Sequence, residues 1–110
     1  MARNLALTDT VTIASAGSTS TSITMQGGRV PIAILTPAAL TGTAFTFECS
    51  VDGTNFYDLY NGGTEYSLTV AASRYIALNP DVFQGVRYVS IVSGPSEAAS
   101  RTIYVISGEL

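Results

Sequence analysis

The sequence predicts an all-β protein: a single antiparallel β-sandwich of about eight short strands. Three observations support this class. Apolar and polar residues alternate with a period of two, turn-favouring residues recur about every 8 to 12 positions, and no long segment repeats its apolar residues at the helical spacing. A chain of 110 residues is long enough for one core and short for two domains. We expect residues 8–110 to form that domain.

The clearest predicted strand is 43–51. Phe45, Phe47, Cys49 and Val51 fall on one face, and the residues between them are polar, as in a strand with one buried side. Other segments alternate in the same way or are rich in the β-branched and aromatic residues that favour strands. In chain order these segments are 8–13, 19–25, 30–35, 56–60, 66–70, 74–78, 86–93 and 101–107.

Turn residues separate the predicted strands. Asp52-Gly53 predicts a hairpin with a short loop, because both residues tolerate the positive φ of a tight turn. Asn61-Gly62-Gly63 predicts a second turn. Residues 37–40 and 80–83 are each expected to form one helical turn, and the small polar residues of 14–22 are expected to form a mobile loop.

Two of the predicted strands are apolar on both faces. A two-layer sandwich buries only one side of each sheet, so the second apolar face needs a cover, either a loop of the same chain or a neighbouring molecule. In 86–93 the opposed sets are Val89 and Ile91 against Val86, Tyr88 and Val92; in 101–107 they are Ile103 and Val105 against Tyr104 and Ile106.

The composition excludes most catalytic chemistry. The chain has no histidine, lysine or tryptophan, and it has one cysteine. This removes histidine-based triads, lysine Schiff bases, lysine-containing phosphate loops and zinc sites of the usual ligand count. We therefore expect no enzyme activity, no cofactor and no metal. Cys49 is expected to be an inert core thiol with a pKa raised by burial.

The charge pattern limits the partners. Five arginines against eight acidic residues give a net charge of −3, which argues against nucleic acid. No apolar stretch approaches membrane-spanning length, and residues 1–8 lack the apolar core of a signal peptide, so we expect a chain made and folded in a cytoplasm. Only 12% of the residues are charged, about half the roughly 25% typical of soluble domains. This fits either a β domain whose surface is solvated by serine and threonine hydroxyls or a subunit packed against other molecules.

Three weaker site hypotheses remain open. A pair of acidic residues around the two turns could hydrolyse a glycoside. Oxygen ligands in the same region could hold calcium, although their spacing differs from that of an EF-hand loop. Exposed tyrosines near the hairpin tips could stack on a glycan or contact a protein partner. The acidic residues are Glu48, Asp52, Asp58 and Glu65. The candidate calcium ligands are Asp52, Asn55 and Asp58, and the tyrosines are Tyr57 and Tyr60.

Four segments of the second half of the chain form a recognisable series: FECSVDGTNF at 47–56, YIALNP at 75–80, FQGVRY at 83–88 and SG at 93–94. Together they resemble small jelly-roll-like decoration, or cement, proteins of tailed bacteriophages. The likeness covers residues 43–110.

This resemblance implies a jelly-roll-like sandwich without enzyme activity. Such a protein would bind the outer surface of the major capsid protein shell, often as a homotrimer, and strengthen it, so its place would be the capsid exterior of a virion. Residues 1–7 lie outside this likeness and are expected to form either an extended arm, in which Arg3, Asn4, Leu5 and Leu7 contact the capsid or a neighbouring subunit, or a frayed terminus. Two alternatives remain: a carbohydrate-binding module that uses Tyr57 and Tyr60, and a phage tail or baseplate subunit.

Overall fold

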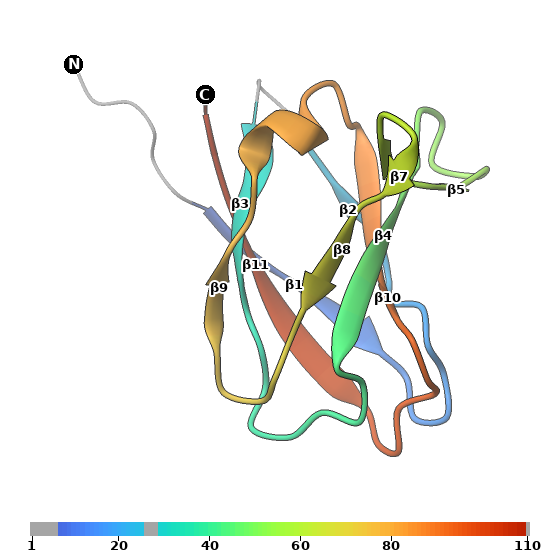
Figure 1. The fold of residues 1–110 in the computed structure, drawn as a ribbon, viewed down its shortest axis with the longest axis vertical. Helices are drawn as coiled ribbons and strands as arrows, with labels where there is room; N and C mark the ends of the chain where they lie inside the picture. Colours follow the sequence, from blue (N-terminus) through green and yellow to red (C-terminus); the bar gives the residue numbers. More distant parts are fainter. Residues whose placement is uncertain (1–6, 26–28, 110) are drawn as a thin grey trace.

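The computed structural model describes residues 7–25 and 29–109, which form two antiparallel sheets packed face to face and a third sheet of only two short strands (Figure 1). The first sheet has the order β1 (Leu7–Ile13), β11 (Arg101–Glu109), β3 (Arg29–Leu35), β9 (Tyr75–Ala77). The second has the order β2 (Ile23–Thr24), β10 (Tyr88–Ser93), β4 (Ala44–Ser50), β5 (Tyr57–Asp58), and β8 (Ser67–Thr69) also pairs with β4. The predicted all-β sandwich is confirmed.

The strand order is that of a jelly roll. The pairs β4–β8, β3–β9, β2–β10 and β1–β11 are nested around one another, as if one long hairpin had been rolled into two layers. Strands from the two halves of the chain therefore alternate within each sheet. As a result β11 lies between β1 and β3, and β10 lies between β2 and β4.

The core lies between the sheets and follows the predicted alternation. Phe45 and Phe47 are fully buried, and Phe47 meets Phe83 edge-on with ring centroids 5.1 Å apart. Tyr66 completes this aromatic cluster with its centroid 5.6 Å from that of Phe83, in the perpendicular geometry that aromatic rings favour. Val51 departs from the prediction: β4 ends at Ser50, and the Val51 side chain is 78% exposed.

Two tight connections differ in how well the sequence predicted them. Asn61-Gly62-Gly63 forms the expected turn, since β6 (Tyr60–Asn61) and β7 (Thr64–Glu65) pair across Gly62-Gly63, and only Gly62 has a positive φ, of 68°. Glycine at the first central position is typical of a type II′ hairpin turn. Asp52-Gly53 does lie in the β4–β5 hairpin, but the expected short loop is wrong, because six residues, 51–56, separate these strands.

Of the two predicted helical turns, one is confirmed and one is wrong. Residues 80–83 form the expected single turn, the 3₁₀ helix η1 (Pro80–Phe83), which the Asn79 side chain caps by accepting a hydrogen bond from the Asp81 N–H. Residues 37–40 form no helical turn, so that prediction is wrong. Within the described part of the chain, no helix is long and apolar enough to cross a membrane.

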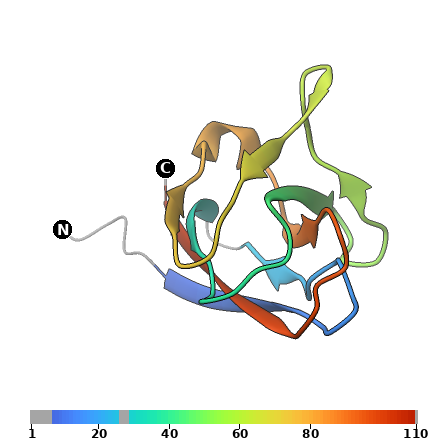
Figure 2. The ribbon, with the colours of Figure 1, turned by 60° about the horizontal axis from the view of Figure 1, so that its bottom comes forward.

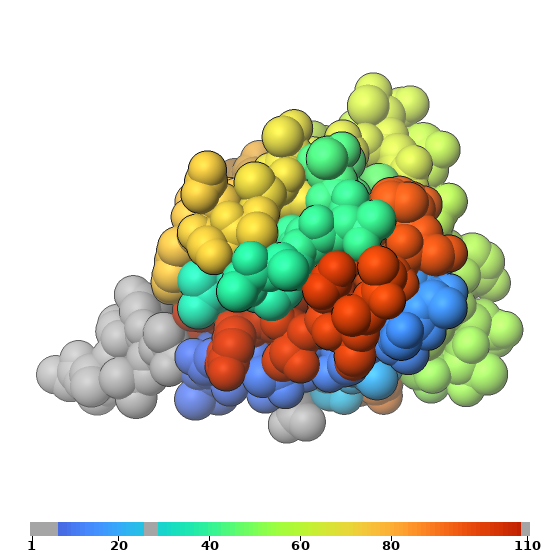
Figure 3. Space-filling view, turned by 90° about the horizontal axis from the view of Figure 1, so that it is seen from below, coloured from blue at the N-terminus to red at the C-terminus, as the bar shows by residue number. Residues whose placement is uncertain are grey.

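Loop 14–18 is held in place by the β10–β11 loop, contrary to the predicted mobile segment. The Ala16 N–H donates to the Glu97 carbonyl at 2.8 Å, and the Glu97 N–H donates to the Gly17 carbonyl at 2.8 Å. Loop 36–43 contacts the β10–β11 loop through Glu97, and Figure 3 shows the β10–β11 loop between the other two loops at the lower end of the molecule.

The Glu97 side chain joins these loops from inside. The carboxylate is buried and accepts four hydrogen bonds: from the Thr41 N–H at 2.8 Å, the Gly42 N–H at 2.9 Å, the Ser93 hydroxyl at 2.7 Å and Arg101 Nε at 2.9 Å. Gly42 has to be glycine here, because a Cβ would overlap the Ser93 hydroxyl. We call this arrangement the Glu97 clamp.

The clamp makes the free energy of unfolding depend on pH in the acidic range. Burial raises the pKa of Glu97, but the hydrogen bonds from Thr41, Ser93, Arg101 and Gly42 outweigh burial and lower it to about 2, from an ordinary 4.5. A pKa lowered by folding gives stability that is complete above the unfolded value and is lost as pH falls through the folded value. We therefore expect the clamp's contribution to decline between pH 4.5 and 2.

The measurement is urea unfolding of the unmodified protein and of Glu97→Gln from pH 7 to pH 2.5. The stability difference between the two should shrink as the pH falls below about 4.5. A difference that stays constant over this range would show that folding does not change the pKa of Glu97.

Candidate docking surfaces

The structure separates the residues that the sequence singled out for partner contact. Tyr57 in β5 is 69% exposed and Tyr60 in β6 is 55% exposed, both at the end of the sandwich that carries β5–β7. Leu7 is exposed too, but it is the first residue of β1 and pairs with Ser107 on the opposite side of the molecule (Figures 1 and 2). Arg3, Asn4 and Leu5 lie outside the described residues.

The loop 51–56 beside Tyr57 is fixed by its own hydrogen bonds. Ser50 Oγ accepts from the N–H groups of Asp52 and Gly53 and donates to Asp52 Oδ1 at 2.8 Å. Asp52 Oδ1 also accepts from the N–H groups of Thr54 and Asn55, each at 2.9 Å, and Asp52 Oδ2 accepts from the Asn55 amide. These bonds, first those from Asn55 and Thr54, hold the pKa of Asp52 far below its usual range.

The structure brings the acidic residues near this loop together only in part. The oxygens of Asp52 are used within its own loop, and Glu48 and Asp58 are brought together only as cross-strand neighbours of β4 and β5. In the described ranges no three histidine, cysteine or acidic side chains gather around a point where a metal could bind. This arrangement gives no support to the calcium hypothesis.

A groove opens between loop 51–56 and the segment that follows η1. Its volume is about 250 Å³, and it lies where the core reaches the end of the sandwich. Burial first, and then the neighbouring Glu48 carboxylate, raise the pKa of the half-buried Cys49 thiol to about 11, as the sequence predicted in direction. The lining residues are Cys49, Ser50, Val51, Tyr57, Leu59, Val82, Gln84, Gly85 and Val86.

A second hollow, of about 390 Å³, lies on the other side of the segment Gln84–Val86. It differs from the groove because two arginines, Arg29 and Arg87, are among its lining residues. The segment Gln84–Val86 lines both the groove and this hollow.

A further exposed surface lies on the outer face of the β1–β11–β3–β9 sheet. The inward residues of these strands, such as Ile103, Val105 and Ile34, belong to the core, so the alternate residues point outward. The strand register places four outward residues in one row across the sheet. We call this the outer row: Thr10, Tyr104, Leu35 and Tyr75.

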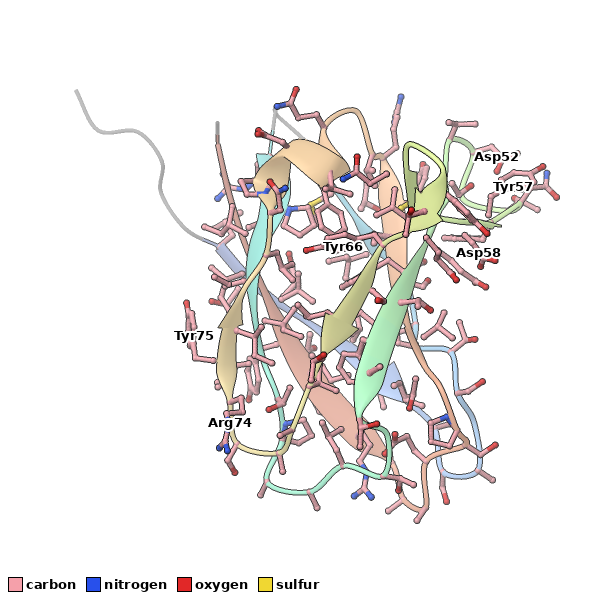
Figure 4. All side chains as sticks on the ribbon, in the orientation of Figure 1. Asp52, Tyr57, Asp58, Tyr66, Arg74 and Tyr75 are labelled. Atoms are coloured by element: carbon pink, nitrogen blue, oxygen red, sulfur yellow. The ribbon has the colours of Figure 1, made fainter. Side chains whose placement is uncertain are left out.

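The outer row is uncharged, and its three large side chains are exposed. Tyr75 is 66% exposed, and Leu35 and Tyr104 are exposed as well. Figure 4 places Tyr75 on the side of the molecule opposite Tyr57 and Asp52. Sequence reasoning missed Tyr75 and Leu35, since only the register of three strands brings them beside Tyr104.

The strands predicted to be apolar on both faces are covered unequally. In β10, the Tyr88 ring lies against Gly53, so the chain's own loop 51–56 covers part of the second face. In β11, Ile106 is buried, whereas Tyr104 stays exposed in the outer row. Within residues 7–25 and 29–109, no segment of the chain covers the large side chains of the outer row.

Comparison with known proteins identifies a similar fold but no family for this chain. No family model matches the chain, and a search of curated proteins finds no match. Among solved structures, the SPBc2 prophage-derived protein YomS is similar over 99% of both chains with a TM-score of 0.58 and 13% sequence identity. At this identity the likeness shows a shared fold.

Other solved structures are less similar. A chain of the Drosophila NLP core has a TM-score of 0.43 at 19% identity, covering 94% of this chain and 96% of its own. A chain of the Bacillus endospore appendages has a TM-score of 0.39 at 15% identity, covering 99% of this chain and 92% of its own. Scores this low do not establish a common fold.

Proposed function

We propose that the protein is a non-enzymatic structural component of a bacteriophage virion, which binds the outer surface of the major capsid protein shell and stabilises it. The observation that carries this proposal is the outer row, an exposed and uncharged strip with two tyrosines on the outer face of a sheet. The resemblance of residues 43–110 to decoration proteins supports the same function, as does a fold like that of a prophage-derived protein.

The outer row has the chemistry of a protein interface. Its residues contribute aromatic and aliphatic area without a charge that would have to be desolvated. Tyrosine is enriched among residues that dominate binding energy, because it buries a large ring and keeps a polar hydroxyl. On a capsid the same modest contact is repeated many times, so each copy needs little affinity for the decorated shell as a whole to be stabilised.

The experiment mixes the purified protein with undecorated, expanded heads and measures bound protein and the heat resistance of the shell. We expect saturable binding and a higher disruption temperature. Leu35→Glu places a charge in the outer row and should weaken binding by about tenfold or more. Thr69→Glu, on the exposed side of β8 in the other sheet, is the matched control and should bind like the unmodified protein.

Three outcomes would count against the proposal. The unmodified protein would not saturate the heads, Leu35→Glu would bind as well as Thr69→Glu, or a glycan array would show selective binding that Tyr57→Ala abolishes. The last result would favour the carbohydrate-binding alternative. Binding to tails rather than heads would favour a tail or baseplate subunit. A native mass measurement tests the proposed homotrimer.

A further inference from the structure

The groove at the β5 end of the sandwich is an open end of the hydrophobic core. Four of its lining residues, Cys49, Leu59, Val82 and Val86, are partly buried and pack against the core from one side. Its remaining lining residues are also uncharged. The raised pKa of Cys49 keeps the thiol neutral at physiological pH, so the walls and floor of the groove carry no charge.

The rim of the groove is built before any partner arrives. Val51 is 78% exposed and Tyr57 is 69% exposed, so neither side chain is held there by the core. The hydrogen bonds of Ser50 and Asp52 fix the loop that carries Val51, and the pairing of Tyr57 with Cys49 fixes the other wall. A preorganised rim loses little conformational entropy on binding.

The charges around the groove select the kind of partner. Two exposed carboxylates adjoin the groove: Asp52 follows the lining residue Val51, and Asp81 accepts a hydrogen bond from the side chain of the lining residue Gln84. Figure 4 shows Asp52 and Tyr57 together at this end of the molecule, whereas Asp58, the cross-strand partner of Glu48, belongs to the other face of the sheet. The adjoining cation is Arg87, next to Val86. An uncharged groove with a mainly acidic rim is complementary to an apolar side chain that has basic neighbours.

We propose that this groove binds an apolar side chain, such as leucine, presented by a basic segment of a partner protein. The volume of about 250 Å³ accommodates one such side chain, and the carboxylates of Asp52 and Asp81 attract the flanking cations. This inference goes beyond the proposed function, since the groove and the outer row lie on opposite sides of the molecule.

The probes are blocked peptides, and the readout is the nuclear magnetic resonance of the methyl groups of Val51, Leu59, Val82 and Val86. A peptide with leucine between two arginines should shift these signals and saturate. Replacing its leucine with alanine should weaken binding about tenfold, the effect of losing one buried aliphatic side chain. Replacing both arginines with glutamates should weaken it further, and added salt should reduce binding of the arginine peptide.

A second readout uses the chain's one cysteine. Cys49 lines the groove, so saturating leucine peptide should slow its reaction with a small maleimide several-fold. Tyr57→Ser removes a wall of the groove and should weaken peptide binding. Tyr60→Ser is the matched control, since Tyr60 is exposed at the same end but does not line the groove, and it should leave binding unchanged.

Several results would overturn the inference: no saturable shift with the leucine peptide, equal binding of the alanine peptide, or equal losses in the two tyrosine variants. The outcome is separable from that of the proposed function. If the leucine peptide does not bind but the protein still binds phage heads, only the proposal about the groove is wrong. If the peptide binds but the protein does not bind heads, only the proposed capsid function is wrong.

Discussion

Replacing Glu97 with alanine is expected to lower the free energy of unfolding by about 3–5 kcal/mol, because it removes one member of a buried ion pair and leaves the other partners without an acceptor. The Arg101 guanidinium would lose the carboxylate that it contacts at 2.9 Å. The N–H groups of Thr41 and Gly42 and the hydroxyl of Ser93 would lose their acceptor too. A typical domain has only about 5–15 kcal/mol of stability, so the variant should unfold readily.

Urea unfolding at neutral pH measures this effect. Glu97→Gln is the control: the amide keeps the shape and can still accept hydrogen bonds through its oxygen, so it should lose less stability than the alanine variant. Equal stability of all three proteins would show that the clamp contributes nothing and that the three loops are held by other contacts.

Replacing Phe83 with alanine is expected to cost about 3–5 kcal/mol, the usual range for deleting a buried aromatic ring and leaving a cavity. Phe83 has no exposed surface, and its ring meets both Phe47 and Tyr66 edge-on. It is also the last residue of η1, so its ring anchors the helical turn that closes one end of the sandwich.

Thermal and urea unfolding of Phe83→Ala and Phe83→Leu provide the test. Leucine refills most of the cavity and should recover more than half of the loss. Because Val82 and Gly85 line the groove next to this ring, the alanine variant should also disturb the groove methyl signals, whereas Thr69→Glu should not. Similar stability of the alanine variant and the unmodified protein would mean that Phe83 is not part of the core.

The fold class could be predicted from local pattern, because a strand with one buried face alternates within its own few residues. The strand order could not be predicted in the same way, since the pairing of β1 with β11 joins residues such as Val11 and Ile103 from the two halves of the chain. Val51 shows that apolar alternation does not reveal where a strand ends. The apolar alternation continues through it, but the hydrogen bonds of Ser50 and Asp52 turn the chain away from β4.

The sequence predicted exposed candidate contact residues only where a turn lies close to them in the chain. Tyr57 and Tyr60 lie near predicted turns and are exposed, although nothing yet tests their contact with a partner. The outer row depends on the register of three strands, and the burial of Glu97 depends on loops far away in the sequence. In the sequence, Glu97 stands among Gly94, Pro95 and Ser96 and looks like any solvated loop residue.

The antiparallel pairing of β1 with β11 also decides how the domain bears tension. Leu7 stands opposite Ser107 and Ile13 opposite Arg101, so the outer ends of both strands lie at the same end of the ladder. A force that pulls these two ends apart therefore separates the strands progressively and loads one cross-strand pair of residues at a time. A force that acts along the two strands in opposite directions instead loads every cross-strand pair at once, so the same ladder resists shear better than peeling.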